Sequence, residues 1–123
     1  MKSNLEQAQE FRRAFGVQNS QKLPTRALQK NLIVEEFKEF LEAEGMLFRN
    51  NSIFRAECLK ELSDLVYVCY QYAENMEWDL DEALSRVHQS NMSKLENGHP
   101  LYRDDGKVLK GKNYKPPILE DLV

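Results

Sequence analysis

The spacing of hydrophobic residues favours helices over strands. Apolar side chains recur every three or four positions through most of the first 97 residues, and no run alternates apolar and polar residues as an exposed strand does. Between Thr25 and Leu95 there is one glycine, Gly45, and no proline. Because glycine and proline are the residues that most often interrupt helices, this stretch favours continuous helix. We therefore expect an all-α fold.

Capping and turn residues divide the chain into four helices. Gly16 ends the first, Asn51 or Ser52 begins the third, and Asp79 with Glu82 forms a capping box at the start of the fourth. The helices are expected at residues 3–15, 25–48, 52–76 and 79–97. The remaining residues, 98–123, hold four turn signals and are expected to form an irregular tail. We expect one domain over residues 1–123, a four-helix bundle with this tail.

The third expected helix is unusually apolar. Residues 62–73 read LSDLVYVCYQYA, which is apolar on nearly every side of a helix. Such a helix must be buried all round, either at the centre of a monomer or in a subunit interface. We favour the interface and expect a homodimer.

Composition and charge exclude several classes of protein. Seventeen Lys and Arg against 20 Asp and Glu give a formal net charge of −3, which argues against nucleic acid as a partner. No apolar run approaches the roughly 20 residues of a membrane span, and the first residues do not resemble a signal peptide. Cys58 and Cys69 match no zinc spacing and are expected to be reduced thiols. We expect a cytoplasmic protein without a membrane partner.

Acidic residues interrupt the apolar pattern of the second and third helices. Glu36 and Glu39 are three residues apart and Glu35 is four before Glu39, so their side chains converge on one stripe. Glu61 and Asp64 repeat the three-residue spacing within the most apolar stretch of the chain. An ionised carboxylate in such surroundings costs several kcal/mol unless a cation compensates it.

A divalent cation is the compensation that we expect. Lys38 and Lys60 are the nearest basic residues, but each is expected about 100° around its helix from the carboxylate beside it, and the two cannot neutralise four or five acids on an inner face. Oxygen ligands without His or Cys specify a hard ion, Mg²⁺ or Mn²⁺, and no His follows these acids by three residues as a di-iron site requires. The alternative is that these acids are the solvated faces of amphipathic helices.

Two pairs of motifs resemble a known family. EEFKE (35–39) followed by ELSD (61–64) resembles the E-E-x-x-E … E-x-x-D signature of the MazG-like, all-α nucleoside triphosphate pyrophosphohydrolases. This superfamily includes phosphoribosyl-ATP pyrophosphohydrolase and the dimeric dUTPases. VHQSNMSKL (87–95) and DGKVLKGKNYKPPILEDL (105–122) resemble the C-terminal half of the phosphoribosyl-ATP pyrophosphohydrolase-like branch. Together the resemblance covers residues 5 to 122.

The resemblance implies a fold, an activity and a set of residues. The fold would assemble as a dimer or a dimer of dimers, and the enzyme would cleave a nucleoside triphosphate between the α and β phosphates with Mg²⁺, giving the monophosphate and pyrophosphate. The implied metal ligands are Glu36, Glu39, Glu61 and Asp64. Glu35 would be a further ligand or would orient the attacking water, and Asn91 and Lys94 would contact the phosphates or the sugar.

The basic tail leaves two interpretations open. Lys110 and Lys112 could close over the substrate, or the tail could only solubilise the bundle. Tyr114 is a candidate for stacking on the base, or else an anchor that docks the tail. Outside catalysis, the alternative is a helical dimer that acts as a binding module through its acidic face. Among enzymes, a dUTPase-like and a phosphoribosyl-ATP-specific activity both fit, because nothing in the sequence specifies the base.

Overall fold

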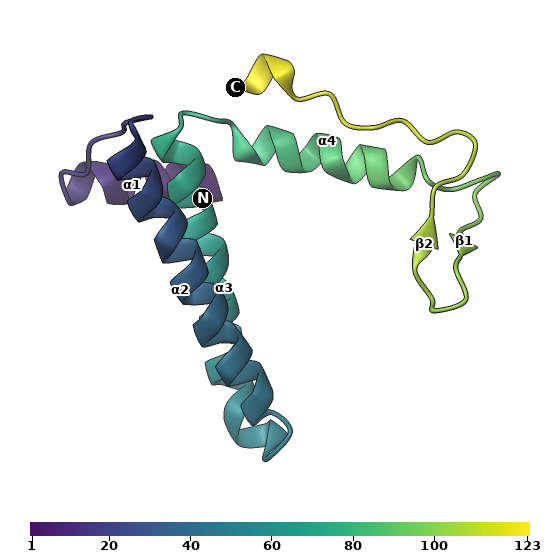
Figure 1. The fold of residues 1–123 in the computed structure, drawn as a ribbon, viewed down its shortest axis with the longest axis horizontal. Helices are drawn as coiled ribbons and strands as arrows, with labels where there is room; N and C mark the ends of the chain where they lie inside the picture. The colour runs from purple at the N-terminus through teal and green to yellow at the C-terminus, as the bar shows by residue number, and fades with distance from the viewer. The chain divides into compact units, whose positions relative to one another are not determined.

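The computed structural model describes all residues, 1–123, and confirms the all-α class (Figure 1). The elements in order are α1 (Asn4–Ala14), α2 (Leu23–Met46), α3 (Asn51–Asn75), α4 (Leu80–Met92), β1 (Leu101–Tyr102), β2 (Val108–Leu109) and the 3₁₀ helix η1 (Glu120–Leu122). None of the helices is both long and apolar enough to cross a bilayer. The chain divides into two compact units, residues 1–78 and 79–123, which are described separately.

Side-chain caps start three of the four helices. Ser3 Oγ accepts from Glu6 N at 3.1 Å in α1, and Asn50 Oδ1 accepts from Ile53 N at 3.3 Å in α3. Asp79 Oδ1 accepts from Glu82 N at 3.0 Å in α4. The helix α2 has no such cap and begins with proline in its first turn, where the missing N–H costs nothing.

The helix α4 is shorter than the spacing predicts. It ends at Met92, whereas the apolar pattern predicted helix to residue 97. The Ser93 hydroxyl donates to Ser90 O at 2.6 Å, and the Lys94 and Leu95 N–H groups make turn-type bonds three residues back. These local bonds compete with helix propagation, as serine hydroxyls commonly do.

In the first unit, α2 and α3 form an antiparallel hairpin and α1 packs on α3 (Figure 1). The buried apolar side chains are few: Ala8, Ala43, Tyr70, Ala73 and Met76. Phe11 of α1 stacks against Phe15 at 4.5 Å and meets Tyr67 of α3 edge-on at 5.8 Å between ring centroids. Small residues at the contacts let the helix backbones approach closely, and the aromatic pairs fill the remaining space.

A buried arginine joins α1, the connection after it and the end of α3. The Arg12 side chain is 4% exposed and donates to Asn19 Oδ1 (2.6 Å), Gln71 Oε1 (3.2 Å) and Asn75 Oδ1 (3.0 Å). It also donates to the carbonyl oxygens of Gln18 and Gln71. All five N–H donors of the guanidinium are therefore used. Burial lowers the pKa of this group.

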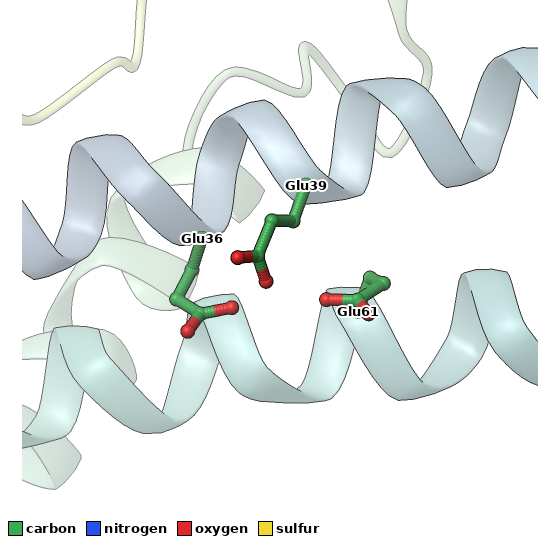
Figure 2. A group of neighbouring side chains, drawn as sticks. All are labelled: Glu36, Glu39 and Glu61. Carbon is green, nitrogen blue, oxygen red and sulfur yellow. The ribbon is translucent and has the colours of Figure 1, made fainter.

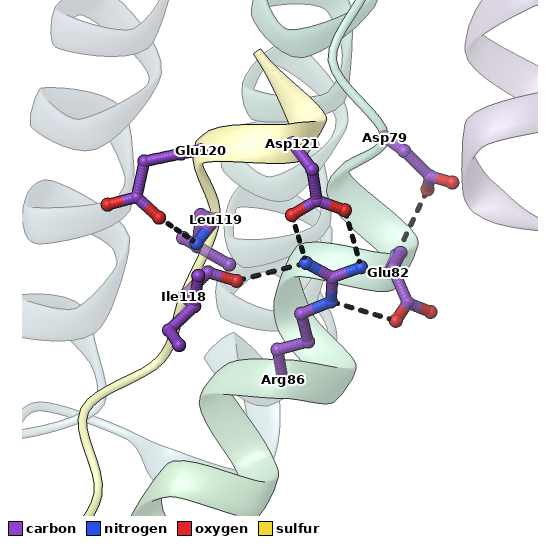
Figure 3. A network of polar contacts seen from close by, with 7 residues as sticks. All are labelled: Asp79, Glu82, Arg86, Ile118, Leu119, Glu120 and Asp121. Carbon is purple, nitrogen blue, oxygen red and sulfur yellow. Dashed lines mark hydrogen bonds and ion pairs between the residues drawn. The ribbon is translucent and has the colours of Figure 1, made fainter.

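The second unit folds the tail back along α4. The Ser90 hydroxyl donates to Lys115 O at 2.8 Å, and Lys115 N donates to Ser93 Oγ at 2.9 Å. Further along, Arg86 donates to both oxygens of Asp121 (2.6 and 3.0 Å) and to Ile118 O (3.0 Å), as Figure 3 shows. These bonds hold the pKa of the Asp121 carboxyl below its ordinary value. The irregular tail is thus anchored to one face of the helix.

Candidate active site

Three carboxylates meet across the α2–α3 hairpin. Glu36 and Glu39 project from α2 toward α3, and Glu61 projects from α3 toward α2 (Figure 2). One oxygen from each side chain lies within 4.8 Å of the others. The three-residue spacing puts the α2 pair on one helix face, and the antiparallel hairpin brings Glu61 opposite that face. This group is called the acidic cluster below.

The acidic cluster has buried oxygen atoms without partners. Glu61 is 7% exposed, and its Oε2 atom has no hydrogen-bond partner. Glu36 is half-buried, and its Oε2 atom is likewise buried and unpartnered. Buried polar atoms are almost always satisfied, and an unpaired buried charge is costly. An all-oxygen donor set of this kind fits a hard divalent cation.

Mutual repulsion within the acidic cluster shifts the titration of Glu39. The hydrogen bond and charge repulsion between Glu39 and Glu36, with smaller effects of burial and of Glu61, raise the pKa of Glu39 to about 7. In the metal-free protein, Glu39 therefore keeps its proton to a higher pH than an ordinary glutamate does. The proton does part of the neutralisation that a bound cation would do.

We expect the stability of the metal-free protein to fall as the pH rises. The pKa of Glu39 is about 7 in the fold against an ordinary value of 4.5, so this group favours the folded state below pH 4.5 and loses that contribution by pH 7. Melting temperatures measured in EDTA from pH 5 to pH 8 should decline, and Glu39→Gln should flatten the decline. Equal slopes for wild type and variant would contradict the pKa shift.

The structure shows Lys60 and Asp64 in positions that the sequence did not predict. Lys60 Nζ is 3.3 Å from Glu61 Oε1 and 2.9 Å from Asp64 Oδ2, so the expectation that Lys60 points away from the carboxylates beside it was wrong. Lys60 and Asp64 are one helical turn apart and share a face, and the long lysine stem also reaches its neighbour Glu61. These bonds raise the pKa of Lys60. The i, i+4 spacing was the signal that could have revealed this pair.

Asp64 is less buried than its apolar neighbours suggested. Its side chain is 39% exposed, and it is not among the carboxylates that meet within 4.8 Å. Glu35 is exposed on α2 and is also outside the acidic cluster. Lys38 is exposed and makes no ion pair. The structure thus brings together three of the five predicted acids.

The other predicted site residues belong to the second unit. Asn91 is exposed in the last turn of α4, and Lys94 is half-buried in the turn that follows. Lys110 and Tyr114 are in the tail, where Lys110 Nζ lies 4.7 Å from the centroid of the Tyr114 ring. This cation–π contact orients the lysine and was not expected from the sequence.

A comparison with models of protein families identifies the family of this chain. The model of phosphoribosyl-ATP pyrophosphohydrolase matches residues 6–91. The chain belongs to this family. The match spans most of α1 to the last turn of α4 and includes the whole acidic cluster, so it confirms the resemblance carried by the motifs at 35–39 and 61–64. The resemblance of residues 105–122 stays a prediction, because the match ends at residue 91. No curated protein matches the sequence.

Membership of the phosphoribosyl-ATP pyrophosphohydrolase family gives the class of reaction. The protein is a hydrolase that acts on phosphorus-containing anhydrides, and the family depends on divalent metal ions. The acidic cluster supplies a donor set that suits such an ion. The matched region ends at residue 91, before Lys94 and the tail.

Proposed function

We propose that the protein is a Mg²⁺-dependent nucleoside triphosphate pyrophosphohydrolase, which cleaves between the α and β phosphates and releases a nucleoside monophosphate and pyrophosphate. The observation that carries the proposal is the acidic cluster, with two buried oxygens that have no partner, inside the region matched by the family model. Mn²⁺ has the same preference for oxygen ligands and is an alternative to Mg²⁺.

The carboxylates of α2 and α3 have separate roles in this proposal. Glu36, Glu39 and Glu61 hold the ion, and Asp64 joins them when its bond to Lys60 is exchanged for the ion. A bound divalent ion would lower the pKa of a coordinated water and offset the charge of the phosphates. Glu35, exposed beside Glu36 on α2, is available to orient the attacking water and accept its proton.

Residues of the second unit supply positive charge for the substrate. A nucleoside triphosphate carries close to four negative charges, and the segment 94–115 carries six Lys and Arg against three Asp and Glu. Lys94 and Lys110 make no ion pair with a carboxylate, so both ammonium groups are available to phosphate oxygens. Asn91 would donate to the phosphates or the sugar, and Tyr114 would stack on the base.

The activity is tested by incubating the protein with a panel of nucleotides. The eight common NTPs and dNTPs and phosphoribosyl-ATP are incubated with the protein and Mg²⁺, and pyrophosphate and orthophosphate are measured separately. Pyrophosphate release from at least one nucleoside triphosphate, abolished by EDTA, supports the proposal. Orthophosphate release, or turnover of phosphoribosyl-ATP alone, would contradict it.

We also propose that two copies of the chain form a dimer through the hairpin. The helices α2 and α3 leave a set of large apolar side chains exposed: Leu28, Val34, Phe37, Leu41, Ile53, Leu59, Leu62 and Val66. Several of them belong to the apolar stripe that a monomer would bury. Apolar surface of this extent on a soluble protein usually marks an interface.

We expect sedimentation equilibrium at micromolar concentration to give twice the 14.4 kDa chain mass, or four times if dimers pair. Phe37→Lys, which puts a charge on this face, should shift the population toward monomer. Lys38→Ala, at the adjacent exposed position, is the matched control and should leave the mass unchanged. A wild-type mass of 14.4 kDa would exclude the dimer.

A further inference from the structure

A single lysine pairs with the carboxylates of the α2–α3 hairpin. Lys60 Nζ is 2.9 Å from Asp64 Oδ2 and 3.3 Å from Glu61 Oε1. Neither Glu36 nor Glu39 makes an ion pair. The second oxygen of Glu61, Oε2, is buried and has no hydrogen-bond partner. One ammonium group thus provides part of the positive charge that the acidic cluster needs, and it also pairs with the neighbouring Asp64.

The contacts of Lys60 are easily broken. The side chains of Lys60 and Asp64 are 60% and 39% exposed, and ion pairs with this exposure contribute about 0–1 kcal/mol. Within a helix, a lysine four residues before an acid is also the less favourable order of such a pair. The pair therefore adds little to the stability of α3, and the lysine stem is flexible enough to leave Asp64 without unfolding the helix.

An alternative partner for Lys60 lies on the other side along the same helix. Glu57 precedes Lys60 by three residues, is exposed and makes no ion pair. Side chains three residues apart in a helix are neighbours, and here the acid precedes the lysine, which is the more favourable order. An ammonium group that leaves Asp64 can therefore pair with Glu57 near the solvent.

We propose that the ammonium group of Lys60 is the resident cation of this site, which a divalent ion must displace in order to reach Asp64. The inference rests on the proposed function, which makes Asp64 a metal ligand. Displacement by Na⁺ or K⁺ would exchange one positive charge for another and gain no electrostatic energy, whereas Mg²⁺ or Mn²⁺ brings two charges. Lys60 thus sets the affinity of the site and its selectivity for divalent over monovalent ions.

Calorimetric titration with Mn²⁺ in the absence of nucleotide tests the displacement. We expect Lys60→Gln to bind Mn²⁺ about fivefold more tightly than wild type, because no ion pair has to be broken. Lys38→Gln is the matched control, since it removes the same charge from an exposed position on α2 that makes no ion pair. The control should retain the wild-type affinity. Unchanged or weaker binding by Lys60→Gln would overturn the inference.

The selectivity is tested by changing the monovalent salt at constant ionic strength. Tetramethylammonium is too large to be coordinated by carboxylates in place of a metal ion, whereas Na⁺ is small enough. In Lys60→Gln, NaCl should weaken Mn²⁺ binding about threefold relative to tetramethylammonium chloride, because Na⁺ then competes for the vacated position. Wild type should bind Mn²⁺ equally in both salts. The same response to Na⁺ in the two proteins would overturn the selectivity.

These titrations require no turnover, so they separate this inference from the proposed function. Tighter Mn²⁺ binding by Lys60→Gln in a protein that releases no pyrophosphate would support the inference and contradict the proposed function. Pyrophosphate release by a protein whose Lys60→Gln variant binds no more tightly would overturn the inference alone. Failure of wild type and both variants to bind Mn²⁺ would overturn the inference together with the metal site.

Discussion

The Glu61→Gln variant is expected to lose metal-dependent pyrophosphate release by at least about 100-fold and to melt at a higher temperature than wild type in EDTA. Glutamine keeps the size of the side chain but replaces a charged oxygen donor with a neutral amide. Glu61 is 7% exposed, and its Oε2 atom is buried without a partner. Removing this charge relieves repulsion from Glu36 and Glu39 and removes a ligand that the ion requires.

The two readouts of this variant move in opposite directions, which distinguishes a ligand from a structural residue. Lys60 loses one of its two acidic partners but keeps Asp64 at 2.9 Å. The lost ion pair therefore offsets little of the stability gained when the repulsion is relieved. The melting temperature with Mg²⁺ or Mn²⁺ should rise in wild type and stay constant in the variant. Glu42→Gln, on the exposed face of α2, is the matched control and should behave as wild type. A fully active Glu61→Gln would exclude Glu61 as a metal ligand.

The Arg12→Met variant is expected to be less stable than wild type by about 3 kcal/mol. Methionine keeps the apolar stem but provides no donors, so acceptors on Gln71, Asn75 and the connection after α1 lose their partners. Each buried acceptor left unpaired costs about 1–3 kcal/mol, partly recovered where water enters or where Asn75 keeps its bonds to Ser20. Urea denaturation followed by circular dichroism measures the change.

The neighbouring residue provides the control for Arg12. Arg13 is exposed on the same helix, and its side chain makes no hydrogen bond or ion pair, so Arg13→Met should change stability by less than about 0.5 kcal/mol. Arg12→Lys should lie between wild type and Arg12→Met, because an ammonium group has three donors where the guanidinium has five. If Arg12→Met and Arg13→Met are equally stable, the buried network contributes nothing to the fold.

Local features of the chain could be predicted from the sequence alone. Caps at Ser3 and Asp79 act on backbone groups within three residues, and helical periodicity repeats within one turn. The same short-range geometry put Glu36 and Glu39 on one face, and the short connection between α2 and α3 placed Glu61 opposite them. The sequence therefore predicted the four helices, the family and the centre of the candidate site.

Features that depend on contacts between distant residues needed the folded chain. Arg12 binds Gln71 and Asn75, 59 and 63 positions away, and nothing in the local sequence distinguishes Arg12 from Arg13. Gly111 resembles any glycine of a turn until its approach to the Lys94 carbonyl is seen. Helix propensity and hydrophobic periodicity depend only on residues close together in the sequence. The sequence alone therefore shows which groups are able to interact. Which groups do interact depends on how helices and tail pack, because burial and close approach arise only when distant segments exclude water together.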